Sequence, residues 1–340
     1  MDGDQQRRAG LLLTDPEHAV SDVLLADAHH VAPALRRVQP ECQCKTGFRA
    51  NRVLLLERGD LVLGPRVIPV RYDDGKNVNI EYRFAEGKYD RLAGFAAEFV
   101  RRPVDLIVAL APPAALAAKV ATTTIPIVFI VGLDPVAAGL VASLNQPGGN
   151  ATGLTLITGP LGQKRLEILR ELGCKSKIVP VLVNPTSPDS VPEIRDVQAA
   201  ARTMGLELRL VNASTPDEID TAFMTIAQLH SDGLLVSTDP FFTIRREQIV
   251  QLATKLAVPT VYPFREFAAA GGVASYGPSL TAAWRQVGIY AGRILKGDKP
   301  ADLAVMQPTT FELVINLNAA RRLNINVPAT LHARSDDVID

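Results

Sequence analysis

Short polar side chains recur in this chain directly after apolar runs, where a loop leads into a helix. Two of these places carry an Asp-Pro pair, Asp134-Pro135 and Asp239-Pro240. Asp accepts hydrogen bonds from the free N–H groups of a helix's first turn, and Pro is favoured at the first helical position. Free N–H groups at a helix start also suit a bound anion, whereas a carboxylate suits an ammonium or hydroxyl group. The chemistry indicated is the holding of a small polar molecule.

Other candidate side chains share this position at the end of an apolar run. Asn184 follows the run Ile178–Val183, and aromatic residues such as Phe241 and Tyr262 could supply the apolar walls of a pocket. Simpler roles stay open, since a helix cap would explain each Asp and core packing would explain Phe241 and Phe242. We expect the ligand-binding residues to be Pro112, Asp134, Pro135, Asn184, Ser237, Asp239, Phe241, Tyr262 and Tyr276.

From about residue 75 onward, apolar runs of strand length alternate with helical patterns. In 89–102, for example, Leu92, Phe95 and Phe99 recur at the spacing of an amphipathic helix. The predicted strands are 78–83, 104–110, 125–131, 178–183, 206–211, 233–237, 259–262 and 273–276. The predicted helices are 89–102, 114–121, 161–172, 191–204, 216–229, 244–256 and 280–295, with a short one after Asp134. This alternation is typical of βαβ units, whose strands form a parallel sheet.

Two such series follow one another, with a junction near residues 155–165. The fold predicted is α/β, with two doubly wound parallel-sheet lobes and a ligand cleft between them. Ligands of such sheets bind at the carboxyl ends of the strands, which is where the candidate residues would lie. We expect the lobes at 75–157, joined by 278–304, and at 158–277, followed by a C-terminal strand, helix and tail at 305–340.

Composition and missing motifs narrow the function. Lys plus Arg and Asp plus Glu number 36 each and aromatic residues make up 5%, a balance that argues against a nucleic-acid partner. The three cysteines match neither a disulfide framework nor a zinc site, so no metal is expected. No nucleophile elbow, P-loop or dinucleotide-binding glycine motif is found, so we expect no cofactor and no enzymatic activity.

Several ordered stretches resemble one protein family. They are Gly75–Arg83, Ala121–Phe129, Gly139–Thr155, Val181–Pro185, Asp239–Phe242, Tyr262–Phe267 and Phe311–Asn316. From about Gly75 to its end the chain is similar to the substrate-binding proteins of bacterial ABC transporters, in the group that includes tryptophan-binding and other aromatic amino-acid-binding members.

The resemblance implies a type I periplasmic-binding-protein fold whose two lobes close on an amino acid or related carboxylate. It implies a non-enzymatic protein, with the permease and ATPase of an importer as partners and a periplasmic location, although the N-terminus does not read as a secretory signal. It also implies that the loops of Asp134, Asn184, Asp239 and Tyr262 line the cleft.

Two regions depart from the family pattern. Residues 1–74 form an unassigned segment without sustained periodicity, in which Leu54–Leu56 and Leu61–Leu63 are candidate short strands. On this pattern the first lobe would lack its central strand, and the change at Asp74-Gly75 suggests a shifted reading frame, which sequencing of the locus would test. The second departure is Ala111-Pro112-Pro113, where relatives often carry Gly and Thr or Ser.

Three alternatives remain open at this point. The same fold serves as the ligand-sensing core of transcription repressors, but such a protein would carry a helix-turn-helix upstream. An α/β enzyme with two similar lobes would need a convergent catalytic set of residues. A binding-defective copy of the family would fold poorly or bind no solute.

Overall fold

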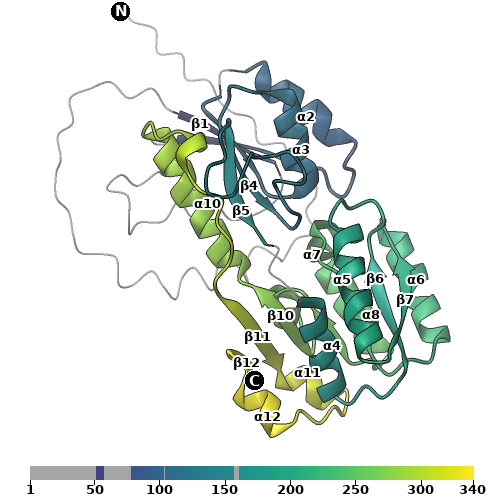
Figure 1. Ribbon diagram of the computed structural model, residues 1–340. Helices are drawn as coiled ribbons and strands as arrows, with labels where there is room; N and C mark the ends of the chain where they lie inside the picture. Colours follow the sequence, from purple (N-terminus) through teal and green to yellow (C-terminus); the bar gives the residue numbers. More distant parts are fainter. Residues whose placement is uncertain (1–50, 57–77, 103, 157–160) are drawn as a thin grey trace, which may run out of the picture. The chain divides into compact units, whose positions relative to one another are not determined.

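The computed structural model describes residues 51–56, 78–102, 104–156 and 161–340, and for 51–56 it describes the backbone alone. Within this part of the chain the strands form two sheets, one of five strands and one of seven (Figure 1). The predicted α/β class, with helices packed on predominantly parallel sheets, is therefore confirmed. The candidate strand at Leu61–Leu63 lies outside the described residues.

The first sheet is entirely parallel and has the strand order β2-β1-β3-β4-β5. Its strands are β1 Asn51–Leu56, β2 Val78–Arg83, β3 Leu106–Ala109, β4 Ile127–Val131 and β5 Ala151–Thr155. The expectation that this sheet lacks a central strand is wrong, because β1 runs between β2 and β3 and pairs with both. β5 was not predicted, because its sequence Ala-Thr-Gly-Leu-Thr contains no run of large apolar residues.

Alternate side chains of the first sheet pack against helices on opposite faces, as the period of two along a strand requires. One face, with Ile127 and Phe129, packs against α2 (Arg91–Val100) and α3 (Pro112–Ala121). The other, with Val128 and Ile130, packs against α10. α10 (Leu280–Leu295) comes much later in the chain, so a segment distant in sequence covers the second face of the first sheet.

The second sheet has the order β12-β11-β10-β9-β8-β6-β7, and every neighbouring pair is parallel except β10 with β11. Its strands are β6 Ile178–Val183, β7 Glu207–Asn212, β8 Leu234–Val236, β9 Thr260–Tyr262, β10 Ala274–Pro278, β11 Phe311–Asn316 and β12 Asp337–Ile339. The C-terminal strands thus belong to this sheet.

Helices cover both faces of the second sheet. One face packs against α4, α5, α11 and α12, and the other against α6 to α9. These helices are α4 Leu161–Glu171, α5 Ser190–Thr203, α6 Pro216–Gln228, α7 Pro240–Ile244, α8 Arg246–Lys255, α9 Arg265–Ala269, α11 Leu317–Arg322 and α12 Ala329–Ala333. A 3-10 turn, η2, spans Pro300–Asp302.

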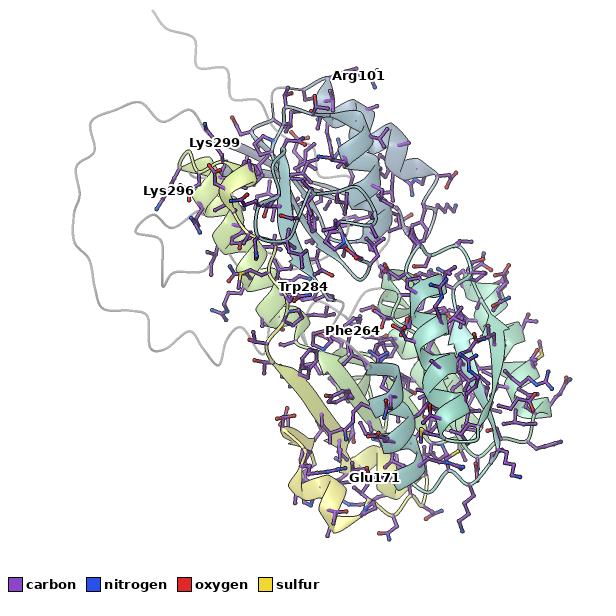
Figure 2. The ribbon with its side chains drawn as sticks, viewed as in Figure 1. Arg101, Glu171, Phe264, Trp284, Lys296 and Lys299 are labelled. Carbon is purple, nitrogen blue, oxygen red and sulfur yellow. The ribbon has the colours of Figure 1, made fainter. Side chains whose placement is uncertain are left out.

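Two side chains contact the apolar cores of both sheets. Leu156, which follows β5, and Trp284 of α10 each pack against the cluster on the α10 face of the first sheet and against the α6–α9 cluster of the second. Figure 2 labels Trp284 together with Phe264, a buried member of the second cluster. In the described part of the chain, no helix combines the length and apolar character that a membrane crossing needs.

The loop after β4 differs from its prediction. Residues 135–139 form consecutive turns instead of the expected short helix. Ala138 N–H donates to Asp134 C=O as in a helical turn. Gly139 has a φ of 71°, which interrupts the right-handed helical conformation. Only glycine adopts such a backbone conformation without strain, and the turn therefore stops after one round.

Candidate functional site

The carboxyl ends of β6 and β8, adjacent strands of the second sheet, bring two predicted site residues together. Asn184 follows β6 and Asp239 follows β8 by three residues. The Nδ2 of Asn184 donates to Oδ1 of Asp239 at 3.2 Å. Both residues are only 1% exposed, so this hydrogen bond is shielded from water.

Asp239 also caps α7. Its Oδ1 accepts hydrogen bonds from the backbone N–H groups of Phe241 at 2.9 Å and Phe242 at 3.3 Å. Burial raises the pKa of Asp239, while the side chains of Asn184 and Ser187 and the two N–H groups oppose the rise. The helix-cap role that the sequence left open is thus present, and it holds the carboxylate at a defined place.

A loop of the first sheet contacts this carboxylate. The hydroxyl of Tyr89, in the segment between β2 and α2, lies 3.4 Å from Oδ2 of Asp239. Gly87 in the same segment has a φ of 81°, and a Cβ built on it would lie 2.9 Å from Cδ2 of Phe241. A residue without a side chain is therefore required for the ring of Phe241 to approach this loop.

A second buried acid, Asp189, lies at the N-cap position of α5 but does not cap it. Its side chain makes no hydrogen bond to the first turn of the helix. It is 4% exposed and its Oδ1 has no hydrogen-bond partner. Burial raises the pKa of Asp189 well above its ordinary value, and the negative charges of Glu193 and Asp239 raise it further.

The Asp189 carboxylate is directed at the first sheet's β4 loop. A Cβ built on Gly132 would lie 2.9 Å from Oδ2 of Asp189. Backbone bonds within the β6–α5 loop, from Ser187 N–H to Asn184 C=O and from Ser190 N–H to Ser187 C=O, hold the loop in this arrangement. The side chain of Ser190 also donates to Asn184 C=O.

An ion pair between buried Arg165 and half-buried Glu193 supports the β8–α7 loop from the side of α4 and α5. Arg165 Nη1 lies 2.9 Å from Oε1 of Glu193, and the same carboxylate accepts from Thr238 N–H at 2.8 and 3.0 Å. Arg165 Nε also donates to the carbonyl of Tyr276 at 2.9 Å. Burial lowers the pKa of Arg165 and raises that of Glu193, and in each case the partner opposes the shift. The pair therefore ties the residue before Asp239 to strand β10.

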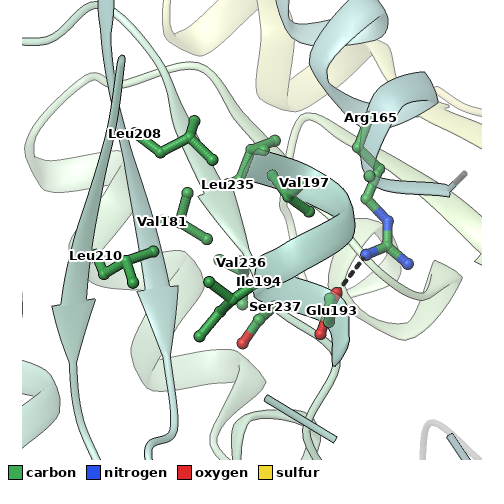
Figure 3. A pocket seen from close by; sticks show the side chains of 11 residues that line it. Arg165, Val181, Glu193, Ile194, Val197, Leu208, Leu210, Leu235, Val236 and Ser237 are labelled. Carbon is green, nitrogen blue, oxygen red and sulfur yellow. Dashed lines mark hydrogen bonds and ion pairs between the residues drawn. The ribbon is translucent and has the colours of Figure 1, made fainter. Parts of the chain in front are cut away.

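A small pocket lies beside this ion pair (Figure 3), lined largely by apolar side chains of α5 and of the strands β6, β7 and β8. Arg165, Glu193 and the predicted site residue Ser237 form its polar end. The lining residues Val197 and Leu235 belong to the core of this sheet face, and neither Asn184 nor Asp239 is among the lining residues.

The predicted residues of the first sheet have different surroundings. Pro112 is buried at the first position of α3, and Pro113 follows it. Asp134 is exposed, and its Oδ1 accepts from the N–H groups of Val136 and Ala137 at 2.8 and 3.2 Å. Pro135 is buried and its carbonyl accepts from the N–H groups of the same turn.

The predicted aromatic residues of the second sheet lie in or near its core. Tyr262 is 1% exposed and stacks on Phe267 with ring centroids 5.0 Å apart. Phe241 is buried beside Phe242, and Tyr276 is half-buried with its ring 6.3 Å from that of Phe311. Tyr262, which was expected to form a pocket wall, is thus packed in the core.

Four residues of this arrangement were missed from the sequence: Tyr89, Arg165, Asp189 and Glu193. Asp189 carried a signal, because it occupies the same strand-to-helix loop as Asn184. The others lie in helices or in the approach to one, and only the packing brings them to these loops.

A family model described as ABC transporter substrate binding protein matches residues 69–339. A protein named tyrosine-binding protein from Clostridioides difficile (strain R20291) is 28% identical over 254 residues, which are 75% of this chain and 73% of that protein.

Solved structures share the fold. A conserved domain protein from Vibrio cholerae is 28% identical with a TM-score of 0.75, and the match covers 85% of this chain and 100% of that one. An ABC domain in complex with L-Trp from Streptococcus pneumonia is 24% identical with a TM-score of 0.72 and coverages of 86% and 100%.

Proposed function

Because the chain belongs to the family of ABC transporter substrate-binding proteins, we propose that it is the solute-binding component of an ABC importer. The family's members are solute-binding proteins without enzymatic activity. In this role the protein would capture an amino acid or a related small carboxylate in the periplasm and deliver it to the permease and its ATPase. Family membership favours this function over the ligand-sensing core of a regulator.

The observation that carries the proposal is the buried Asn184–Asp239 pair with Tyr89 of the other sheet against it. A buried carboxylate is costly unless it is paired, and a ligand ammonium group would supply the missing positive charge. Contacts from both sheets to one ligand would favour a closed arrangement, because a ligand shifts a conformational equilibrium only by its differential affinity. The tyrosine-binding relative supports an amino-acid ligand, aromatic ones first.

The experiment is thermal unfolding of the purified chain against the protein amino acids and small carboxylates. A ligand present at a hundredfold over its dissociation constant adds about 2.7 kcal/mol to the free energy of unfolding, which raises the melting temperature visibly. A selective rise with one class of amino acid is the expected result. A cooperative transition that no amino acid or carboxylate shifts would contradict the proposal and favour a binding-defective copy.

A substitution tests the assigned site. Asp239→Asn keeps a good capping side chain for α7 but removes the charge, so we expect a folded protein whose ligand affinity falls roughly 10- to 100-fold. The matched control is Asp298→Asn, which changes an exposed carboxylate paired with Arg293 beyond the end of α10. Equal affinities of the two variants, measured by isothermal titration calorimetry, would remove Asp239 from the site.

A further inference from the structure

We propose that Asp189 and Asp239 together form a subsite for the ammonium group of a primary amine, and that binding at this site does not require a ligand carboxylate. The inference rests on the proposed function and deepens it. It predicts that amines lacking a carboxylate are ligands alongside the amino acids that resemble them.

Asp189 is oriented away from the helix that it precedes. An Asp at an N-cap normally accepts a hydrogen bond from the first turn of its helix, but this one does not. It is instead 4% exposed, with Oδ1 unpartnered and Oδ2 directed at Gly132 of the other sheet. An unpaired buried carboxylate costs stability, so its retention in this position is explained by a cationic partner that arrives with the ligand.

Asp239 has acceptor capacity left on Oδ2. Its Oδ1 accepts the three bonds from Asn184, Phe241 and Phe242, whereas the bond from Tyr89 to Oδ2 is long, at 3.4 Å. Each carboxylate oxygen offers about two lone pairs. An ammonium group carries three N–H donors, which is enough for both carboxylates. The two acids are near enough for the charge of Asp239 to raise the pKa of Asp189.

The start of α3 lies at the carboxyl end of β3. Helix N-termini bind carboxylates through their free N–H groups. Here the N-cap is Ala111, which has no side-chain donor, and the next two positions are Pro112 and Pro113, which have no N–H. This helix start is therefore poor in donors for a ligand carboxylate, while two buried acids on the second sheet favour positive charge.

The test compares three probes that share a ring: L-tyrosine, tyramine, which lacks the carboxylate, and 3-(4-hydroxyphenyl)propionate, which lacks the amine. Titration calorimetry at neutral pH should give tyramine a dissociation constant within about tenfold of that of tyrosine, and no binding of the acid. The trio of tryptophan, tryptamine and indole-3-propionate repeats the comparison with a larger ring.

Two variants test whether Asp189 contributes to amine binding. Asp189→Asn should weaken tyramine binding more than about tenfold, since it removes a charged hydrogen bond, and Asp298→Asn should leave it unchanged. A thermal melt of each variant shows that it is folded.

The outcomes separate the two proposals. Binding of the amino acid without its amine, or full tyramine affinity in Asp189→Asn, overturns the inference and leaves the proposed function standing. Binding of the amine without the amino acid supports the inference and overturns the amino-acid ligand. Binding of no probe in either trio overturns both for aromatic ligands.

Discussion

The carboxyl-end loops of the two sheets place their acids differently. In the first sheet Asp134 is exposed and its carboxylate is satisfied by its own loop. In the second sheet Asp189 and Asp239 are buried, and one oxygen of Asp189 has no partner. The same residue type after a strand is therefore exposed and bonded only within its own loop in the first sheet, and buried with a raised pKa in the second.

The difference shows what burial adds to a sequence motif. Both Asp-Pro pairs give an Asp that accepts from N–H groups two and three residues later, so local chemistry is alike. Only around Asp239 do Asn184 and Tyr89, from distant parts of the chain, add further contacts. Desolvation then raises the pKa of Asp239.

The largest effect is expected from a substitution that removes the Arg165–Glu193 ion pair, which supports the carboxyl-end loops of the second sheet. Arg165→Ala would leave the half-buried Glu193 without its counter-ion, and we expect the free energy of unfolding to fall by about 3 kcal/mol. Arg321→Ala, which removes an exposed pair with Asp340, should cost at most about 1 kcal/mol. Urea unfolding measures both, and equal losses would show that the Arg165–Glu193 pair contributes no more than a surface pair.

The next prediction concerns pH. The pKa of Asp189 is raised on folding. Above about pH 3.8 its carboxyl is therefore deprotonated in the unfolded chain while it still holds its proton in the folded protein. The contribution of Asp189 to stability therefore falls as pH rises from that value to its folded pKa, by about 1.4 kcal/mol for each pH unit between the two. Melting temperatures from pH 4 to 8 should show the ligand-free protein losing stability relative to Asp189→Asn as pH rises. Parallel curves would contradict a buried, unpaired Asp189.

A smaller effect is expected at the exposed acid of the first region. Asp134→Ala removes the two hydrogen bonds to Val136 and Ala137 N–H, a loss similar to that of a helix cap. We expect about 1 kcal/mol of destabilisation. Thermal unfolding measures it, and a loss above about 3 kcal/mol would mean that Asp134 does more than hold its own turn.

The smallest expected effect lies at the contact between the two regions. Tyr89→Phe removes only the hydroxyl that reaches Asp239 at 3.4 Å, a long bond. We expect ligand affinity to fall about two- to threefold, which corresponds to roughly 0.5 kcal/mol. Titration with the ligand found in the thermal screen measures this, and a loss above tenfold would show that Tyr89 contacts the ligand itself.

Local sequence signals determined most of the elements. The helix over Pro216–Gln228 begins where Thr215-Pro216-Asp217-Glu218 predicts, and Thr215 accepts from Glu218 N–H. The strand Ile178–Val183 and the long helix Leu280–Leu295 also have the predicted bounds. The family resemblance, which covers the chain from about Gly75, agrees with the family match over 69–339.

Tertiary structure alone decided the rest. Strand β1 belongs to the first sheet because β2 and β3 pair with it on either side, although its surrounding sequence shows no period. Tyr89 meets Asp239 across 150 residues, and Asp189 turns from its helix toward Gly132. Caps and periodicity act between neighbouring residues and can be read from the chain. Burial and charge around Asp189 and Asp239 come from segments that only folding brings together, and these determine the direction in which the pKa of each carboxyl shifts.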